Sequence, residues 1–461
     1  MSTTLPTAHD DALLALRHRL DGTLALAGEP GYELATPWNV AVPMTPRAVV
    51  AAAGPDDVVE TVRAANELGL RVAVQRTGHG AVATDGDDVV LVHTGRLDGV
   101  HVDPATRIAR IGAGAVWQQV LDAAAPHGLA PLVGSAPHVG VAGFLTGGGI
   151  GPLVRTFGLS SDTVRAFDVV TGDGRLLHVT PDEHAELFWG LRGGKGTLGI
   201  VCAVELDLLP VAEIVGGALY FDGADAAAVL HAWRTWAPAL PEHANTSVAL
   251  LQLPPLPGVP PVLAGRLTVA VRFASVEDAG TCEALLAPMR AVATPILDAV
   301  GPIPHAAIGA VHADPVDPLP GHEDSSLLRE LPAEAVDALL ALAGPAVRSP
   351  QAVVELRLLG GALARPAAHT SAFCHRGAAF TLSVIGVLAP EIAAIVPGHA
   401  AEVVAALDPW STGGRLPNFT ATADPALLAR CYDESTLAWL GTLAERHDPA
   451  GVLKVGQVVR G

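Results

Sequence analysis

The chain has 461 residues, half of them hydrophobic, which predicts two or three domains and excludes a disordered chain. Its formal net charge of −19 argues against binding to nucleic acid or to an anionic membrane surface. It shows no basic leader followed by an apolar run, no stretch of 18 apolar residues and no close pair of cysteines, so we expect a cytoplasmic protein without a membrane span, a disulfide framework or a structural zinc site.

Short β-type runs alternate with amphipathic segments between residues 40 and 210. Strands are expected at residues 71–75, 88–93, 107–112, 164–171, 175–179 and 200–209. Apolar residues at helical spacing predict helices over 56–68, with Asp56 as the N-cap, and over 117–125. This first half is therefore expected to be α/β.

The sequence pattern changes near residue 211, where strand-like runs are separated by helical segments rich in alanine and leucine. Strands are expected at 266–273, 352–359 and 379–387, which favours a second, α+β domain. The last fifty residues resemble the first half in their sequence pattern, and we expect a loop at 411–418 and a helix at 429–446 there. We therefore divide the chain into residues 1–210, 211–410 and 411–461.

The segment Gly134–Gly151 (GSAPHVGVAGFLTGGGIG) holds seven glycines in 18 residues, too many for a core helix or strand. Glycine lets backbone amides approach a ligand without obstruction, and successive N–H groups can bind phosphate. The alternative is a flexible surface loop, but apolar Val139, Val141 and Phe144 favour packing. Because the segment fits neither the P-loop nor the G-x-G-x-x-G pattern, it indicates only a phosphate-bearing cofactor.

Two further glycine-rich turns adjoin expected strands. The first, residues 75–80 (QRTGHG), follows the strand at 71–75, a position where ligands often bind in α/β layers, although His79 could equally be a surface turn residue. The second, residues 192–201 (RGGKGTLGIV), precedes the strand at 200–209. Three such turns on one α/β layer indicate a long dinucleotide lying across several loops.

In this order the motifs resemble those of the FAD-linked oxidases of the vanillyl-alcohol oxidase superfamily, and most of all its berberine-bridge-enzyme-like branch. The likeness covers Trp38–Pro210 and resumes at Gly413–Gln457, where NF and HDPAGVLKVGQ are similar to the closing segments of the family. The resemblance implies an overall α+β fold. Residues 1–210 would form an FAD-binding PCMH-type domain of two α/β subdomains, 211–410 a substrate domain on an antiparallel sheet, and 411–461 a segment packing back on the FAD-binding domain.

The resemblance also implies which residues hold FAD. His79 matches the histidine that bonds covalently to the flavin in many members, and Ala136 stands where bicovalent members have a cysteine, so a single covalent bond is expected. Val139 lies near a place that influences oxygen access in relatives. The expected cofactor residues are Gly78, His79, Gly80, Gly134, Ser135, His138, Val139, Gly140, Gly143, Phe144, Gly147, Gly148, Thr197, Gly199, Ile200 and Asn418.

Departures from the family pattern bear on the chemistry. Phe144 stands where many members place a histidine near the flavin N1–C2=O edge, and phenylalanine cannot donate a hydrogen bond. Leu416 occupies the place of the tyrosine that serves as base in many alcohol-oxidising members, and Gly451 replaces an asparagine of the tail. Any proton acceptor is therefore expected in the middle domain.

Four residues are candidates for catalysis in the middle domain. Glu355 and Arg357 alternate on an apolar strand, so both project to one face, where they line a substrate pocket or form a structural ion pair. His312 and His375 have the intrinsic pKa for proton transfer near neutrality, although a structural role is the commoner one for such histidines. His138, inside the glycine segment, has the same two interpretations.

These features predict an FAD-dependent oxidoreductase in which a substrate C–H bond delivers hydride to flavin N5. Dioxygen is the expected electron acceptor, since no NAD(P) fingerprint is evident. The alternatives are a dehydrogenase that uses another acceptor and a non-redox protein that keeps FAD as a scaffold. Apolar loops at 253–261 and 302–321 favour a hydrophobic or aromatic small molecule, such as a specialised metabolite. No metal is expected, because no histidine pair has ligand spacing beside a carboxylate; the sequence assigns no oligomeric state.

Overall fold

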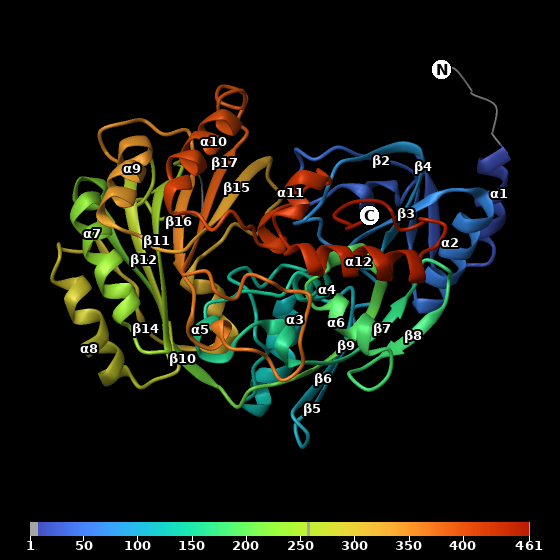
Figure 1. Cartoon of the computed structure of the whole chain (residues 1–461), viewed down its shortest axis with the longest axis horizontal. Coiled ribbons are helices and arrows are strands. Elements are labelled where there is room, and N and C mark those ends of the chain that lie inside the picture. The colour runs from blue at the N-terminus through green and yellow to red at the C-terminus, as the bar shows by residue number, and fades with distance from the viewer. Residues whose placement is uncertain (1–7, 256–258, 461) are drawn as a thin grey trace.

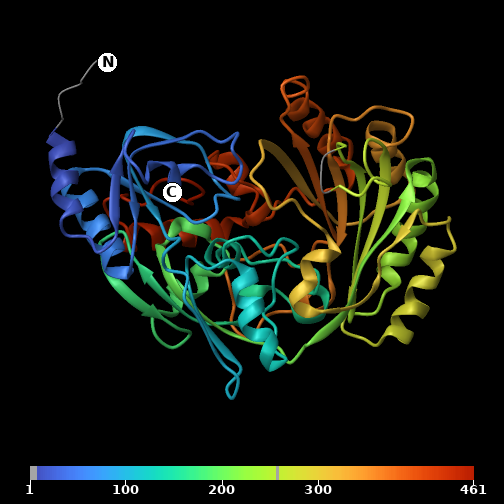
Figure 2. The ribbon, with the colours of Figure 1, turned by 180° about the vertical axis from the view of Figure 1, so that it is seen from behind.

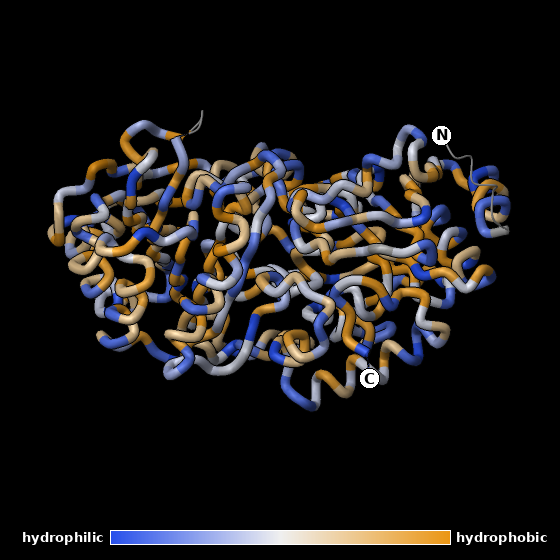
Figure 3. Tube along the Cα trace, turned by 90° about the horizontal axis from the view of Figure 1, so that it is seen from above, coloured by the Kyte–Doolittle hydropathy of each residue, from blue (hydrophilic) through white to orange (hydrophobic). Residues whose placement is uncertain are grey.

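A computed structural model describes residues 8–255 and 259–460, so residues 256–258 of the apolar loop at 253–261 lie outside the described residues. Its strands form three sheets of four, five and eight strands. The two smaller sheets make one half of the molecule and the large sheet makes the other (Figure 1). In the hydropathy-coloured trace, apolar runs follow the interior strands, whereas hydrophilic stretches lie mainly in outer loops and turns (Figure 3).

The four-stranded sheet is built from the first ninety residues. Its order is β1 (Thr23–Leu26), β2 (Met44–Ala51), β4 (Thr84–His93) and β3 (Arg71–Gln75). β4 pairs in parallel with both β2 and β3, while β1 is antiparallel to β2. Val58 and Val62 of α2 (Pro55–Leu68) pack in one buried cluster with Val72 of β3, and α1 (Ala8–Arg17) adds Leu13 to it.

The expectation that Asp56 caps this helix was wrong. The N-cap is Gly54, in extended conformation, and Pro55 takes the first helical position, where its missing N–H costs nothing. The neighbouring Asp57 is buried instead, and its carboxylate accepts hydrogen bonds from the amides of Gly22 and Ala53 at 2.9 and 2.7 Å. Asp57 thereby joins the helix to the start of β1.

The five-stranded sheet is antiparallel throughout and follows directly. Its order is β5 (Val100–Asp103), β6 (Ile108–Gly112), β9 (Ile200–Asp207), β7 (Val164–Val170) and β8 (Leu176–Val179). Helices α3 (Trp117–Ala124), α4 (Val141–Thr146) and α6 (Ala185–Leu191) contact this sheet, whereas the short α5 (Val154–Phe157) contacts β11 (Ala244–Gln252) of the large sheet.

Helix α4 corrects the expectation that the glycine-rich segment contains no core helix. Val141 and Leu145 of this helix are fully buried. The helix is possible because Gly140 and Gly147 lie at its two caps, and Gly143, its one internal glycine, is on the exposed side. Glycine therefore delimits this short helix rather than interrupting it.

The eight-stranded sheet is antiparallel at every pair. Its strands are β10 (Glu213–Asp222), β11 (Ala244–Gln252), β12 (Leu267–Ser275), β13 (Leu297–Asp298), β14 (Gly301–Pro304), β15 (Gly321–Leu328), β16 (Val353–Leu358) and β17 (Phe380–Val387). One face is apolar and is covered by α7 (Ala226–Trp236), α8 (Ala279–Arg290), α9 (Ala333–Ala343) and α10 (Val396–Ala406) (Figure 1).

The opposite face of this sheet carries a band of polar side chains. Residues directly opposite each other in antiparallel strands project to the same side. Ser383 of β17 is opposite both Ser325 of β15 and Glu355 of β16, so these side chains share a face with their i±2 neighbours. We call this band the polar face; its members are Ser247, Arg272, Glu323, Ser325, Glu355, Arg357, Thr381 and Ser383.

Arg155 joins the two halves beneath the polar face. Its guanidinium is buried and donates to three backbone carbonyls of the second half, those of Leu359 at 2.7 Å, Leu240 at 3.0 Å and Ala244 at 3.1 Å. A buried cation bound by three carbonyls fixes the orientation of α5 against the large sheet.

The C-terminal segment returns to the first half, as the views from front and back both show (Figures 1 and 2). It contains α11 (Pro425–Ala429) and α12 (Glu434–His447), where a single helix over 429–446 was expected. The break is local, because Asp433 caps α12 by accepting from the amide of Thr436. No helix in the described residues combines the length and apolar character needed to cross a bilayer.

Asp448 holds the tail to the first half, and its loss is expected to be costly. Its carboxylate is fully buried, accepts from the amides of Val452 and Leu453 at 2.8 and 2.9 Å, and pairs with Arg460. Asp448→Ala should lower the free energy of unfolding by about 3 kcal/mol in urea titrations, because three donors lose their acceptor. Asp448→Asn, which keeps one acceptor oxygen, should lose less; equal losses would contradict this account.

Candidate functional site

His79 lies in the wall of a cavity of about 460 Å³ that is lined mainly by the first half of the molecule, with Val316 and Pro318 contributed by the second half. Trp38, Arg76, Thr77 and His138 line the same cavity. The Trp38 ring stacks on the His79 ring with 4.5 Å between centroids, and the His138 ring is 4.9 Å from His79 on another side. The sequence-predicted residues His79 and His138 are therefore brought together.

The His79 imidazole is neutral and has one unused nitrogen. Nδ1 lies 2.9 Å from Thr77 Oγ1, whereas Nε2 is buried and has no hydrogen-bond partner among the described residues. Burial, reinforced by His138 and only partly opposed by Asp314, lowers the pKa of His79 to about 3. A neutral imidazole with an unpartnered buried nitrogen is suited to act as a nucleophile or ligand toward a group bound in the cavity.

Only glycine fits at position 78. Gly78 has φ +74°, and a Cβ there would lie 2.5 Å from the Cα of Pro37. Gly80 is exposed, and a Cβ there would meet nothing within 4 Å. The turn thus brings its backbone against the 37–38 segment and leaves its other side open, as expected of a turn that holds a ligand.

Phe144 packs inside the glycine-rich segment. Its ring meets Trp117 edge-on at 5.7 Å between centroids, and a Cβ on Gly134 or Gly149 would lie 2.8 or 2.7 Å from ring carbons. A Cβ on Gly148 would lie 2.5 Å from the ring of Phe373. These glycines make room for aromatic side chains of the protein. The sequence had led us to expect that the space beside them is filled by the cofactor.

The remaining glycine-segment residues make hydrogen bonds to other elements. Ser135 Oγ donates to Asp314 Oδ2 at 2.7 Å, which ties the segment to the loop that follows residue 311. Val139 is partly buried and accepts from the amide of Trp117 at 3.2 Å. Gly140 packs against Arg76, a Cβ there lying 3.3 Å from its Cγ.

Lys195 and Asn418 both contact α4 through hydrogen bonds. Of the two, Asn418 was predicted as a site residue from the sequence and Lys195 was not. Asn418 Nδ2 donates to the Phe144 carbonyl at 2.9 Å, and Lys195 Nζ donates to the Gly143 carbonyl at 3.1 Å and to Asn418 Oδ1. Burial lowers the pKa of Lys195 to about 8. The signal in the sequence was its rarity, since Lys195 and Lys454 are the chain's two lysines.

Thr197, Gly199 and Ile200 are not among the residues lining the His79 cavity. Thr197 Oγ1 accepts from the amide of Val459 at 2.9 Å, and a Cβ on Gly199 would lie 2.5 Å from Val169. Ile200 is buried in the core of the four-stranded sheet. The contacts observed for these three residues are structural, and their cofactor contacts stay a prediction.

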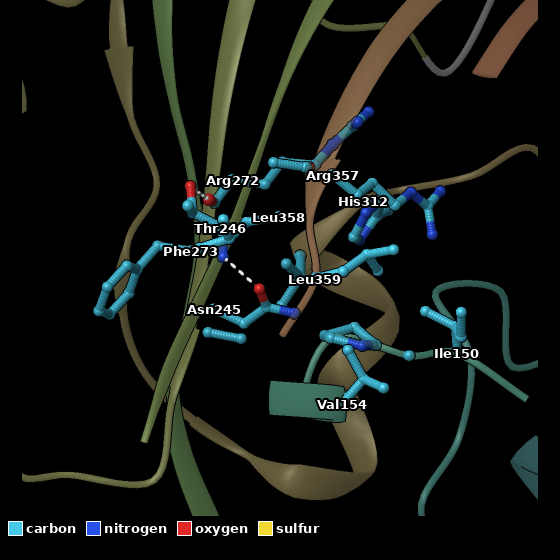
Figure 4. A pocket seen from close by; sticks show the side chains of 15 residues that line it. Ile150, Val154, Asn245, Thr246, Arg272, Phe273, His312, Arg357, Leu358 and Leu359 are labelled. Carbon is cyan, nitrogen blue, oxygen red and sulfur yellow. Dashed lines mark hydrogen bonds between the residues drawn. The ribbon is translucent and has the colours of Figure 1, made fainter. Parts of the chain in front are cut away.

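Glu355 is the centre of a buried charge cluster on the polar face. Its Oε1 accepts from Ser247 Oγ at 2.7 Å and from Arg272 Nη1 at 2.5 Å, and lies 3.3 Å from His312 Nε2. Its Oε2 accepts from Arg357 Nε at 2.7 Å. Figure 4 shows Arg272, His312 and Arg357 around a small cavity that Ile150 and Val154 of the first half also line.

This cluster makes Glu355 a poor proton acceptor. Burial acts to raise the pKa of Glu355, but Arg357 and Arg272 outweigh it and hold the pKa well below its usual range. Burial, together with the same two arginines, lowers the pKa of His312. Glu355 and Arg357 therefore form the structural ion pair that was one of the two interpretations of these residues. Arg357 also lines the small cavity.

His375 is not brought to this cluster. Its Nε2 lies 2.9 Å from the Arg430 carbonyl, and its ring fills the space beside Gly414, where a Cβ would lie 2.5 Å from the ring. Burial lowers its pKa. Its observed contacts are those of a structural histidine packed against the C-terminal segment, which is the commoner of the two roles weighed from the sequence, and its role as a base stays a prediction.

Glu323 was missed by sequence reasoning. It lies on β15, a strand that was not predicted, and projects from the polar face. Its side chain is exposed and has no hydrogen bond or ion pair with any described residue. The polar run HEDSS carries no alternation of apolar and polar residues, so the sequence offered no signal for this strand.

The described residues contain no group of three or more metal-ligating side chains.

Comparison with known proteins supports an FAD site. Residues 46–180 match the family described as the FAD binding domain. The chain is 30% identical to (R)-6-hydroxynicotine oxidase of Paenarthrobacter nicotinovorans over 52% of this chain and 49% of that protein. It is 35% identical to an FAD-linked oxidoreductase of Penicillium expansum over 39% and 33%. The chain thus spans about half or less of these relatives' lengths.

Solved structures show the same fold over nearly the whole chain. 6-Hydroxy-D-nicotine oxidase from Arthrobacter nicotinovorans superposes with a TM-score of 0.80 at 22% identity, covering 95% of this chain and 98% of that one. The berberine-bridge-enzyme-like protein 1 of Physcomitrella patens gives 0.81 at 18% identity, covering 95% and 97%. The expected fold class is thereby confirmed, and the match of residues 46–180 to the FAD binding domain bears out the FAD-linked part of the resemblance.

Proposed function

We propose that this chain is an FAD-dependent oxidoreductase acting on a small organic substrate. Residues 46–180 match the FAD binding domain, and the chain shares the fold of a berberine-bridge-enzyme-like protein. The observation that carries the proposal is His79, whose neutral imidazole leaves Nε2 buried and unpartnered beside a turn that only glycine permits. These features fit FAD, held through a covalent bond to His79.

When bound, FAD supplies the acceptor for two electrons and a hydrogen from the substrate. The chain's own residues position the partners. Asn418 and Lys195 fix α4 by donating hydrogen bonds to two of its backbone carbonyls. The turn at Gly78 places His79 in the cavity wall. Arg155 binds the two halves together through its hydrogen bond to the Leu359 carbonyl. The name of the relative (R)-6-hydroxynicotine oxidase supports a small organic molecule as the electron source. Dioxygen is the proposed electron acceptor, and a dehydrogenase with another acceptor is the alternative.

The test starts from the purified protein, loaded with FAD if it is colourless. A yellow pellet after acid precipitation supports the covalent bond, and a yellow supernatant opposes it while leaving FAD binding intact. Anaerobic mixing with a panel of aromatic and aliphatic alcohols and amines should then bleach the flavin. Return of colour in air supports an oxidase, and lasting bleaching supports a dehydrogenase. No FAD uptake, or no bleaching by any compound, would contradict the proposed function.

A further inference from the structure

Glu355 and His375, two of the candidate bases predicted from the sequence, are both occupied by other groups. The Glu355 carboxylate accepts hydrogen bonds from Ser247, Arg272 and Arg357, and its pKa stays well below the usual range. Leu416, at the place of the family's tyrosine, is an apolar residue that is 2% exposed. His375 is bound to a backbone carbonyl elsewhere.

Glu323 is the carboxylate on the polar face that remains available. It precedes Ser325 by two residues on β15, and Ser325 and Glu355 both lie opposite Ser383, so Glu323 projects to the side on which Glu355 and Arg357 lie. Its neighbour Asp324 is occupied, because it pairs with Arg415 at 2.6 Å on the other face. Asp314 is occupied by Ser135.

Arg357 offers a complementary group nearby. Its Nε is used by Glu355, but its two Nη groups have no partner among the described residues, and its guanidinium lies 5.6 Å from the centre of the Phe419 ring. The charges of Arg357 and Glu323 interact with each other. The polar face thus carries a carboxylate and two Nη groups that have no partner among the described residues, and an aromatic ring lies beside the same arginine.

We propose that Glu323 is the catalytic base of the oxidation, and that the substrate carries an O–H or N–H group on the carbon that is oxidised. The inference rests on the proposed function. The substrate's C–H bond breaks with its electron pair leaving to the bound flavin, its O–H or N–H bond breaks with the proton passing to the Glu323 carboxylate, and a C=O or C=N bond forms. The Arg357 Nη groups bind an oxygen of the same molecule, and Phe419 packs against its apolar part.

The surroundings of Glu323 suit this role near neutral pH. Its side chain is exposed to solvent, yet partial desolvation by the surrounding chain is the main reason that the pKa of Glu323 rises to about 7. Arg357 opposes the rise, while Glu355, Asp314 and Asp324 contribute to it. The carboxylate therefore exchanges its proton in the range where a general base is most effective.

The test is stopped-flow flavin reduction under anaerobic conditions with a compound that bleaches the wild-type holoprotein. The wild-type rate should rise about tenfold per pH unit below pH 7 and level off above it, as the carboxylate loses its proton. Glu323→Gln should slow reduction by about 10²–10⁴-fold and remove this pH dependence. Glu323→Asp should recover part of the rate and keep the pH dependence.

Glu391→Gln, at an exposed carboxylate in a loop, is the matched control and should behave as wild type. Unchanged FAD content and unfolding midpoint in Glu323→Gln separate loss of the base from loss of the fold. Reduction of Glu323→Gln at the wild-type rate, or an unaltered pH profile, would overturn the role of Glu323 and leave the proposed function standing. A wild-type protein that no compound reduces would overturn both.

Discussion

Replacing Glu355 with alanine is expected to lower the free energy of unfolding by about 3–5 kcal/mol, because it leaves two buried cations without their counter-charge. The Arg272 and Arg357 side chains are 6% and 13% exposed, and each donates to this one carboxylate. Ser247 also loses its acceptor. Urea titrations that follow tryptophan fluorescence measure the loss as a lower unfolding midpoint.

A double variant distinguishes this explanation from simple loss of packing. Arg272→Met removes one of the two cations, so Glu355→Ala combined with Arg272→Met should cost less than the sum of the two single losses. A strictly additive double variant, or a loss below about 0.5 kcal/mol in Glu355→Ala, a change usual for surface sites, would show that the cluster does not stabilise the fold in this way.

Replacing His79 with alanine is expected to remove all acid-stable flavin from the protein. In wild type the proposed bond keeps the flavin in the acid pellet, whereas the alanine variant has no nitrogen to form it. Because His79 is half-buried and its side chain contacts only the cavity wall and Thr77, the variant should fold and still bind FAD without the bond. Turnover should be slower, since a covalent bond raises the flavin potential.

His138→Ala is the matched control for His79→Ala. The two rings lie 4.9 Å apart in the same cavity, so both variants lose an imidazole from nearly the same place. Only the His79 variant should release yellow flavin into the acid supernatant. If flavin stays in the pellet of His79→Ala, another residue carries the bond and the assignment of His79 is wrong.

Short-range features of the chain were predictable. The turn at Gly78 and the glycine segment at 134–151 depend on a few consecutive residues, and backbone space near a ligand is a local requirement. The strands at 71–75 and 108–112 also formed where apolar residues alternate between turn signals. The error at α4 was local as well, since glycines at both caps of a helix were taken as evidence against it.

The strands of the large sheet were predicted less completely. β10, β11 and β15 were not expected, because each carries glycine or polar residues that mask the alternation of a strand. Their polar side chains are stabilised by neighbours far away in the sequence. Ser247, Arg272 and Glu355 meet although they are 108 residues apart at the extremes.

The glycine-rich turns of the sequence indicated a phosphate-bearing dinucleotide, because the backbone space near a ligand is set within a few residues. The resemblance of the ordered motifs to a known family then implied FAD, the fold class and the role of His79. Only the tertiary structure decided which carboxylate is free to react. Glu355 and Glu323 lie on the same face of the large sheet, but strand register places Arg272, Ser247 and Arg357 around the first and leaves the second without a hydrogen-bond or ion-pair partner among the described residues. The availability of a charged group depends on its neighbours in space, and strand pairing determines which residues those are.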